Sequence, residues 1–167
     1  DCFFGHSPTV SRFLPRPEPM PANEPRTLWV AMGLAFARTV LGLIFFMAGM
    51  YKVFTLGPAG HVAKYFLPFQ DTILPTWALW AVGFIIPFVE LASGALLLLG
   101  WRRSEAYAAL GTVLVTVTFG HLLHDALYPF HEHVMPRLAL LVLLLLMPPA
   151  ADRFSVDELL RRRRTGR

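Results

Sequence analysis

Two ionisable residues lie in the middle of long apolar stretches, where each is the single charge. An ion near the centre of a bilayer costs about 2.5–3.5 kcal/mol on insertion scales, so it faces the interior of a helix bundle and finds a partner. At 1.5 Å per residue, Arg38 lies roughly 13 Å beyond Trp29, and Glu90 lies roughly 16 Å before Trp101. We therefore expect Arg38 and Glu90 to meet at one depth and form a buried ion pair.

This pair has a structural and a chemical interpretation. It can lock two helices together, or Arg38 and Glu90 can be catalytic residues that polarise or protonate a bound group such as a quinone. Pro87 lies one turn before Glu90 and frees the backbone carbonyl of Gly83, which predicts a kink beside the acid. The sequence leaves both interpretations open.

Small residues share a helical face with the arginine. Arg38, Gly42, Phe45, Gly49 and Lys52 fall within one arc of roughly 80° on a helical wheel, and Gly94 follows Glu90 by one turn. Small residues let membrane helices approach closely. The pattern predicts tight packing between the first two apolar stretches.

A second polar cluster is expected at the far end of the third stretch, at the depth of Lys52. A divalent metal is possible there, because His and carboxylate at helical spacing can share an ion. A quinone, a pigment or a proton relay is also possible, because histidine titrates near neutral pH. The third interpretation is a wet rim that hydrogen-bonds Lys52 and Arg137. The cluster contains His121, His124, Asp125, Tyr128, His131 and His133.

The elements that must position these residues are four apolar stretches, over residues 29–51, 77–99, 106–123 and 134–149. The chain has 167 residues, of which 55% are hydrophobic and 16% are charged, against about 25% charged in a typical soluble domain. Only Arg38, Glu90 and Arg137 are charged within the stretches. Because a spanning helix needs about 20 apolar residues, we expect an all-α, integral membrane four-helix bundle.

The fourth helix is expected to begin a few residues before Val134 and to stop early at Pro148 and Pro149. In the first loop, Val62, Tyr65 and Phe66 recur at i, i+3 and i+4. This spacing predicts a short amphipathic helix at the membrane interface.

The positive charges give the predicted orientation. Eleven of the 15 lysines and arginines lie in the two tails and the second loop, and three lie on the opposite side. The positive-inside rule then places both termini in the cytoplasm, in a bacterial inner membrane by expectation. The net positive charge of the chain is explained by the lysines and arginines in the tails and loops that flank the spans, so no nucleic-acid partner is expected. An aromatic belt facing lipid or partner subunits is predicted at the ends of the stretches, from Trp29, Trp77, Trp80 and Trp101.

Three parts are expected along the chain: a proline-rich cytoplasmic tail over 1–26, the transmembrane domain over 27–150, and a basic cytoplasmic tail over 151–167. The first tail lacks the apolar core of a signal peptide, and Cys2 within it is expected to be a free thiol.

The second tail begins with a capping box, in which Glu158 follows Ser155 by three residues. An apolar face of Val156, Leu159 and Leu160 comes next. It predicts a surface helix on anionic lipid, with a frayed basic tail as the alternative. The residues expected to contact lipid or a partner there are Arg161, Arg162, Arg163 and Arg164.

Residues 37–52 (ARTVLGLIFFMAGMYK) and 90–103 (ELASGALLLLGWRR) resemble the first- and second-helix signatures of the DoxX family of small membrane proteins. His121 or His124 fits a histidine late in the third helix. The resemblance covers roughly residues 35–148 and implies a four-helix bundle. It also implies an association with redox chemistry: some members resemble the membrane subunit of a thiosulfate:quinone oxidoreductase, and others accompany detoxifying enzymes. The proline-rich tail, the arginine run and the histidine-rich third loop depart from the family pattern.

Three functions are compatible with these residues. The first expectation is a non-catalytic accessory subunit that stabilises a larger respiratory or photosynthetic electron-transfer complex, because the chain is small and has no complete cofactor motif. The alternative is a quinone-reactive membrane subunit of an oxidoreductase. A small-molecule transporter is weaker, because four spans carry no inverted repeat. The expected partners are the lipid bilayer and other membrane subunits. The chain is not expected to be an enzyme on its own.

Overall fold

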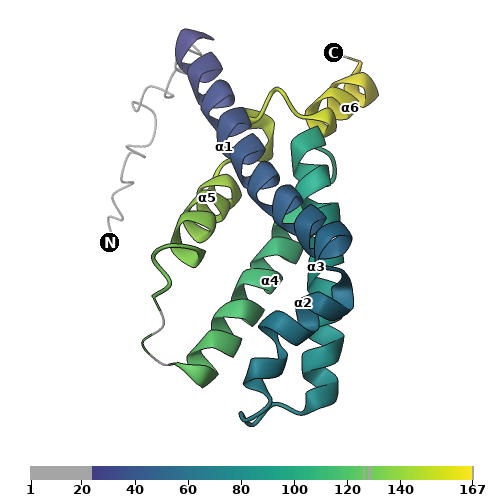
Figure 1. The fold of residues 1–167 in the computed structure, drawn as a ribbon. Coiled ribbons are helices and arrows are strands. Elements are labelled where there is room, and N and C mark those ends of the chain that lie inside the picture. The colour runs from purple at the N-terminus through teal and green to yellow at the C-terminus, as the bar shows by residue number, and fades with distance from the viewer. Residues whose placement is uncertain (1–23, 126, 128, 167) are drawn as a thin grey trace, which may run out of the picture.

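The structure is a computed structural model that describes residues 24–125, 127 and 129–166, and this part of the chain is helical without strands (Figure 1). Most of the predicted proline-rich tail, with Cys2, lies outside the described residues, as does Tyr128. The main helices are α1 (Glu24–Met50), α2 (Pro58–Tyr65), α3 (Thr76–Leu99), α4 (Arg103–His124), α5 (Val134–Leu146) and α6 (Val156–Thr165). Short turns of π or 3₁₀ helix are η2 (Tyr51–Thr55), η3 (Leu67–Phe69) and η4 (Pro149–Ala151).

Three helices are long and apolar enough to cross a membrane, which confirms the first three predicted spans. They cover Thr27–Thr55, where η2 continues α1, then Thr76–Leu99 and Arg103–His124. The shortest has 22 residues, which is roughly 33 Å of helix against a hydrocarbon core of about 30 Å. The predicted helix in the first loop is also present, as α2.

The fourth apolar helix is shorter than predicted. α5 has 13 residues, or roughly 20 Å, which is less than the hydrocarbon core. It begins at Val134, so the prediction of an earlier start is wrong: the chain is still turning there, and the carbonyl of Phe130 accepts the N–H groups of Val134 and Met135. It ends because Met147 is extended before Pro148.

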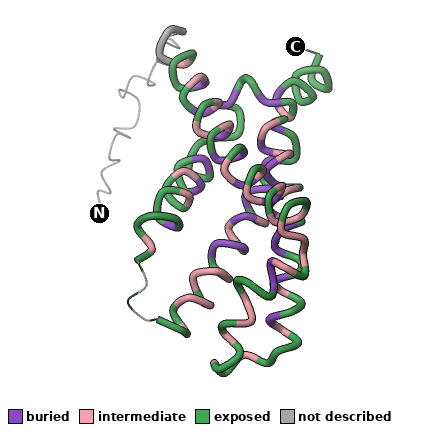
Figure 2. Tube along the Cα trace, viewed as in Figure 1, coloured by how far each residue is buried: buried purple, intermediate pink, exposed green. Residues whose placement is uncertain are grey.

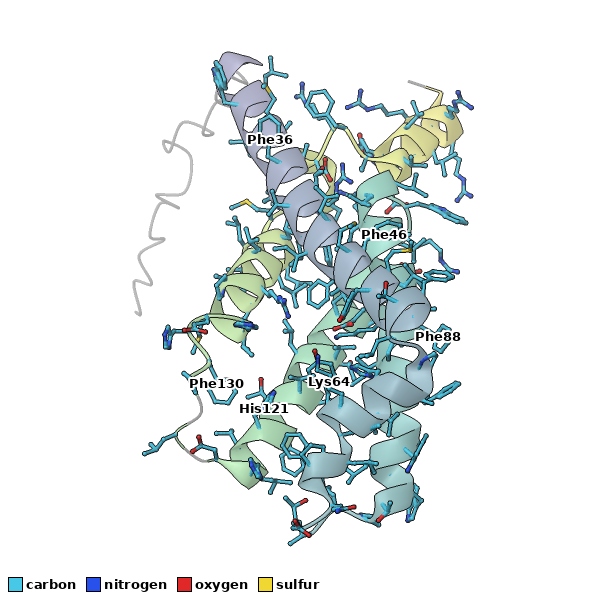
Figure 3. The ribbon with its side chains drawn as sticks, in the orientation of Figure 1. Phe36, Phe46, Lys64, Phe88, His121 and Phe130 are labelled. Atoms are coloured by element: carbon cyan, nitrogen blue, oxygen red, sulfur yellow. The ribbon has the colours of Figure 1, made fainter. Side chains whose placement is uncertain are left out.

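The tightest packing joins α1 to α3, as the small residues predicted. A Cβ built on Gly49 would lie 2.5 Å from the backbone nitrogen of Leu91, and one on Gly94 would collide with the backbone of Phe46. The two backbones therefore touch where neither helix has a side chain. Burial is concentrated on the inner sides of the helices, and large apolar side chains such as Phe36 and Val115 are exposed outside, as expected of a surface that faces lipid (Figures 2 and 3).

The C-terminal segment folds back over the end of α3. The side chain of Ser155 accepts the N–H of Glu158 and caps α6, as predicted. The reciprocal half of the capping box is absent from the described contacts, because the Glu158 carboxylate binds Arg161 and Arg162 instead. Gly100 has φ 68° and would collide with Ser155 if it carried a Cβ, so the turn after α3 requires glycine.

Candidate functional site

A cavity of about 570 Å³ lies between α1, α2, α3, α4 and the start of α5. Its walls are mainly apolar, with Phe45 from α1, Ile86 from α3 and Val113 from α4. A small number of polar side chains open onto it: Lys52, His61, Glu90, Thr116, His121, His133 and Arg137. A largely apolar hollow with a few polar groups is the usual form of a site for a small organic molecule.

An ion pair between Lys52 and Glu90 is the strongest polar feature of this cavity. The Lys52 Nζ lies 2.6 Å from the Glu90 Oε2. The Glu90 side chain is 3% exposed and the Lys52 side chain is 22% exposed, so the acid is buried and the base borders the open space. Lys52 belongs to η2, a π-helical turn. π-Helical turns are frequently found at functional sites.

The predicted pair of Arg38 with Glu90 is wrong. Gly42 packs against Leu97, and Gly49 packs against Leu91, so Glu90 is level with the last turns of α1 and Arg38 is level with the end of α3. The depth estimate failed because it took Trp29 and Trp101 as one membrane level. α1 in fact begins at Glu24 and extends beyond the end of α3 (Figure 1).

Arg38 belongs instead to a buried ion-pair cluster with Asp152 and Arg103 at the end of the bundle. Its Nε donates to the Asp152 Oδ2 at 2.9 Å, and the Arg103 Nη1 donates to the same oxygen at 3.0 Å. Arg38 also donates to the carbonyls of Leu97 and Leu98 in the last turn of α3, where the Leu97 carbonyl accepts the N–H of Gly100 as well. These contacts tie α1 to the end of α3 and to the C-terminal segment. Asp152, an acid that closely follows Pro148 and Pro149, was not among the predicted site residues.

His61 is a second site residue that was not predicted from the sequence. Its Nδ1 lies 2.7 Å from the carbonyl oxygen of Gly83, the group that Pro87 frees within α3. A carbonyl can only accept, so the Nδ1 carries the proton and the Nε2 is an acceptor. Burial, reinforced by the charge of Lys52, lowers the pKa of His61 below its usual value. The sequence did contain one signal for this contact. Pro87 frees the Gly83 carbonyl, and a buried carbonyl needs a hydrogen-bond donor from elsewhere in the chain.

Only some residues of the predicted polar cluster line the cavity in the structure. His121 and His133 line the cavity with Lys52, and His121 lies on the side of α4 that faces α2 (Figure 3). The rings of His121 and His124 both pack edge-on against Phe69, another residue of the cavity wall.

The remaining described members, Asp125 and His131, do not line the cavity. Asp125 follows α4 and accepts the N–H of Leu127. His131 and His133 flank Glu132 at 3.8 and 3.9 Å in exposed positions. Within residues 24–125, 127 and 129–166, no group of three or more His, Cys, Asp and Glu side chains is arranged to hold a metal ion.

Arg137 extends the cavity wall on the α5 side. Its guanidinium lies 5.5 Å from the centre of the Phe45 ring, a cation–π arrangement. With Lys52 it supplies two cationic donors at an apolar space. This combination suits a flat apolar molecule that carries carbonyl oxygens.

The predicted aromatic belt is at the surface: Trp29, Trp77, Trp80 and Trp101 are 70, 76, 40 and 46% exposed. Their contact with lipid or with partner subunits stays a prediction.

The match to a known family covers most of the elements that form the site, but not the start of α5. The model of the DoxX family matches residues 33–123, more than half of the chain and both Lys52 and Glu90. No curated protein and no solved structure matches the chain.

Proposed function

Because the chain belongs to the DoxX family of membrane proteins, we propose that it is the quinone-binding membrane subunit of an electron-transfer assembly. The observation that carries the proposal is the apolar cavity of about 570 Å³ with the Lys52–Glu90 pair in its wall. The cavity favours this function over a purely accessory subunit, which needs no internal binding site.

The residues of the cavity fit a quinone head group. Phe45, Ile86 and Phe69 offer apolar surface to a flat ring. The Lys52 ammonium has three donors, and its bond to Glu90 leaves donors for a carbonyl oxygen. Glu90 holds this ammonium in place, so the acid acts as a positioning residue for the lysine.

Reduction of a quinone to a quinol takes two electrons and two protons. An electron-donating partner subunit supplies the electrons in this proposal. Lys52 holds a proton at its Nζ beside the ligand, and His121 and His133 extend the polar wall toward the loop between α4 and α5. These side chains offer a route for protons from the solvent.

We place the end of the bundle that carries α6 on the cytoplasmic side of a bacterial inner membrane. The support is the excess of arginine at this end, in the tail and in the turn between α3 and α4. The cavity then lies nearer the opposite face. The small-molecule transporter stays the weaker alternative.

The test is calorimetric titration of the purified full chain in detergent with decylubiquinone. Lys52→Met should weaken binding tenfold or more, because a charged hydrogen bond contributes about 1.5–3 kcal/mol. Lys64→Met is the matched control: it removes an exposed lysine outside the cavity. Absence of binding, or equal affinities of the Lys52→Met variant and the unmodified chain, would contradict the proposal.

A further inference from the structure

The last helix of the described chain is fixed to the end of the bundle. The Asp157 carboxylate accepts the backbone N–H groups of Arg102 and Arg103 at 2.9 and 3.0 Å, where α4 begins. The Asp157 N–H donates to the carbonyl of Gly100, and Ser155 is buried against the same turn. α6 is therefore held in one position before it meets any partner.

The face of α6 that points away from the bundle is apolar and then basic. Val156, Leu159 and Leu160 lie on it at i, i+3 and i+4, and they are 37, 51 and 39% exposed. Arg163 continues the same face one turn later. The opposite side carries Glu158, which is 4% exposed.

The arginines exceed the acids available to them. Glu158 binds both Arg161 and Arg162, at 2.7 and 2.9 Å. Arg163 and Arg164 are exposed and have no carboxylate partner in the part of the chain that the structure describes. A groove lined by Arg153, Arg161 and Arg162 lies beside them. The helix end is therefore an unneutralised cationic surface.

We propose that α6 is an anionic-phospholipid binding site, with its apolar face among the upper acyl chains and Arg163 and Arg164 on lipid phosphates. The location supports a lipid partner, because α6 packs against the turn that carries the exposed Trp101, at the end of two spans. An apolar stripe followed by arginines has the form of an interfacial helix. Arginine near an anionic leaflet adds about fivefold to binding per residue. Because the bundle fixes the helix, little ordering is needed on contact.

The test places a probe on the apolar face. Leu159→Cys, in a Cys2→Ser background, is labelled with nitrobenzoxadiazole in the full chain. The protein is reconstituted into nanodiscs of phosphatidylcholine, with or without phosphatidylglycerol. The label should shift to the blue and be quenched by lipids with brominated acyl chains, more strongly when phosphatidylglycerol is present.

Arg163→Gln and Arg164→Gln should each reduce the inserted population about fivefold in anionic discs. Lys64→Gln is the control for each single arginine variant, because it removes one charge from an exposed position outside α6 and should leave quenching unchanged. An unquenched label, equal quenching in both lipids, or an arginine variant that behaves as the control variant does would overturn the proposal.

Discussion

Lys52 and Glu90 join α1 to α3 through an ion pair of 2.6 Å at the wall of the internal cavity. The pair stands where the glycine-lined contact between these helices ends, one turn beyond Gly49. The contact that holds the helices together thus also fixes the cation that borders the cavity.

Glu90→Gln should destabilise the protein, because it leaves the Lys52 ammonium without its counter-ion. A fully buried pair would cost about 3–5 kcal/mol to break, and the partial exposure of Lys52 reduces the expected loss to about 1–3 kcal/mol. Chemical unfolding in detergent measures it. Glu105→Gln changes an exposed pair with Arg102 at 3.3 Å and should change stability by less than about 1 kcal/mol. Equal losses in both variants would argue against a special role for Glu90.

Replacing both partners separates stability from binding. Glu90→Leu with Lys52→Met removes both charges together, so stability should recover toward that of the unmodified chain. Affinity for decylubiquinone should stay low, because the cationic donor is absent. Recovery of both properties would show that the ion pair is purely structural.

Gly49→Ala should destabilise the α1–α3 contact by about 1–3 kcal/mol, because the added methyl group meets the backbone of Leu91 and neither helix can move away freely. Thermal unfolding of the purified chain measures the loss. Gly33→Ala is the control on the same helix, since its Cβ would have no atom within 4 Å. If the two variants unfold at the same temperature, the close approach is not important for stability.

Asp152→Asn should disrupt the buried ion-pair cluster of Arg38, Arg103 and Asp152 at the end of the bundle. Arg38 and Arg103 would lose the charge that both of them contact, and we expect a loss of about 3–5 kcal/mol. Hydrogen exchange should rise first in α6, which follows Asp152 in the chain. Asp71→Asn, at an exposed position, is the matched control. Unchanged protection of α6 in the Asp152 variant would show that this ion-pair cluster does not hold the C-terminal segment in place.

Stability should fall at mildly acidic pH because of His61. Its pKa is lowered by burial in the fold, so the unfolded chain binds a proton more readily. The stabilisation is complete above the ordinary value of 6.5 and is lost as pH falls below it toward the folded pKa. Hydrogen exchange in α2, measured on either side of this range, should show the loss. His61→Gln should flatten the dependence, and a profile identical to that of the unmodified chain would contradict this assignment.

The sequence predicted elements that depend on local pattern. Apolar stretches located three spans, Ser155 located the start of α6, and Gly49 and Gly94 indicated the close helix contact. It could not assign the ion pairs, because the level of one helix against another depends on where each begins and how they cross. Arg38 was thus paired with the wrong acid. Asp152 and His61 were missed because their partners are brought to them by tertiary folding.

Photoaffinity labelling measures directly whether a quinone binds in the cavity. The full chain in nanodiscs is irradiated with an azidoquinone, and the adducts are located by peptide mass spectrometry. We expect adducts on cavity residues such as Lys52, Ile86 and Glu90, and their loss when decylubiquinone competes. Adducts confined to outward positions such as Phe84 and Ile85, which are 47 and 56% exposed, or adducts that decylubiquinone does not displace, would contradict it.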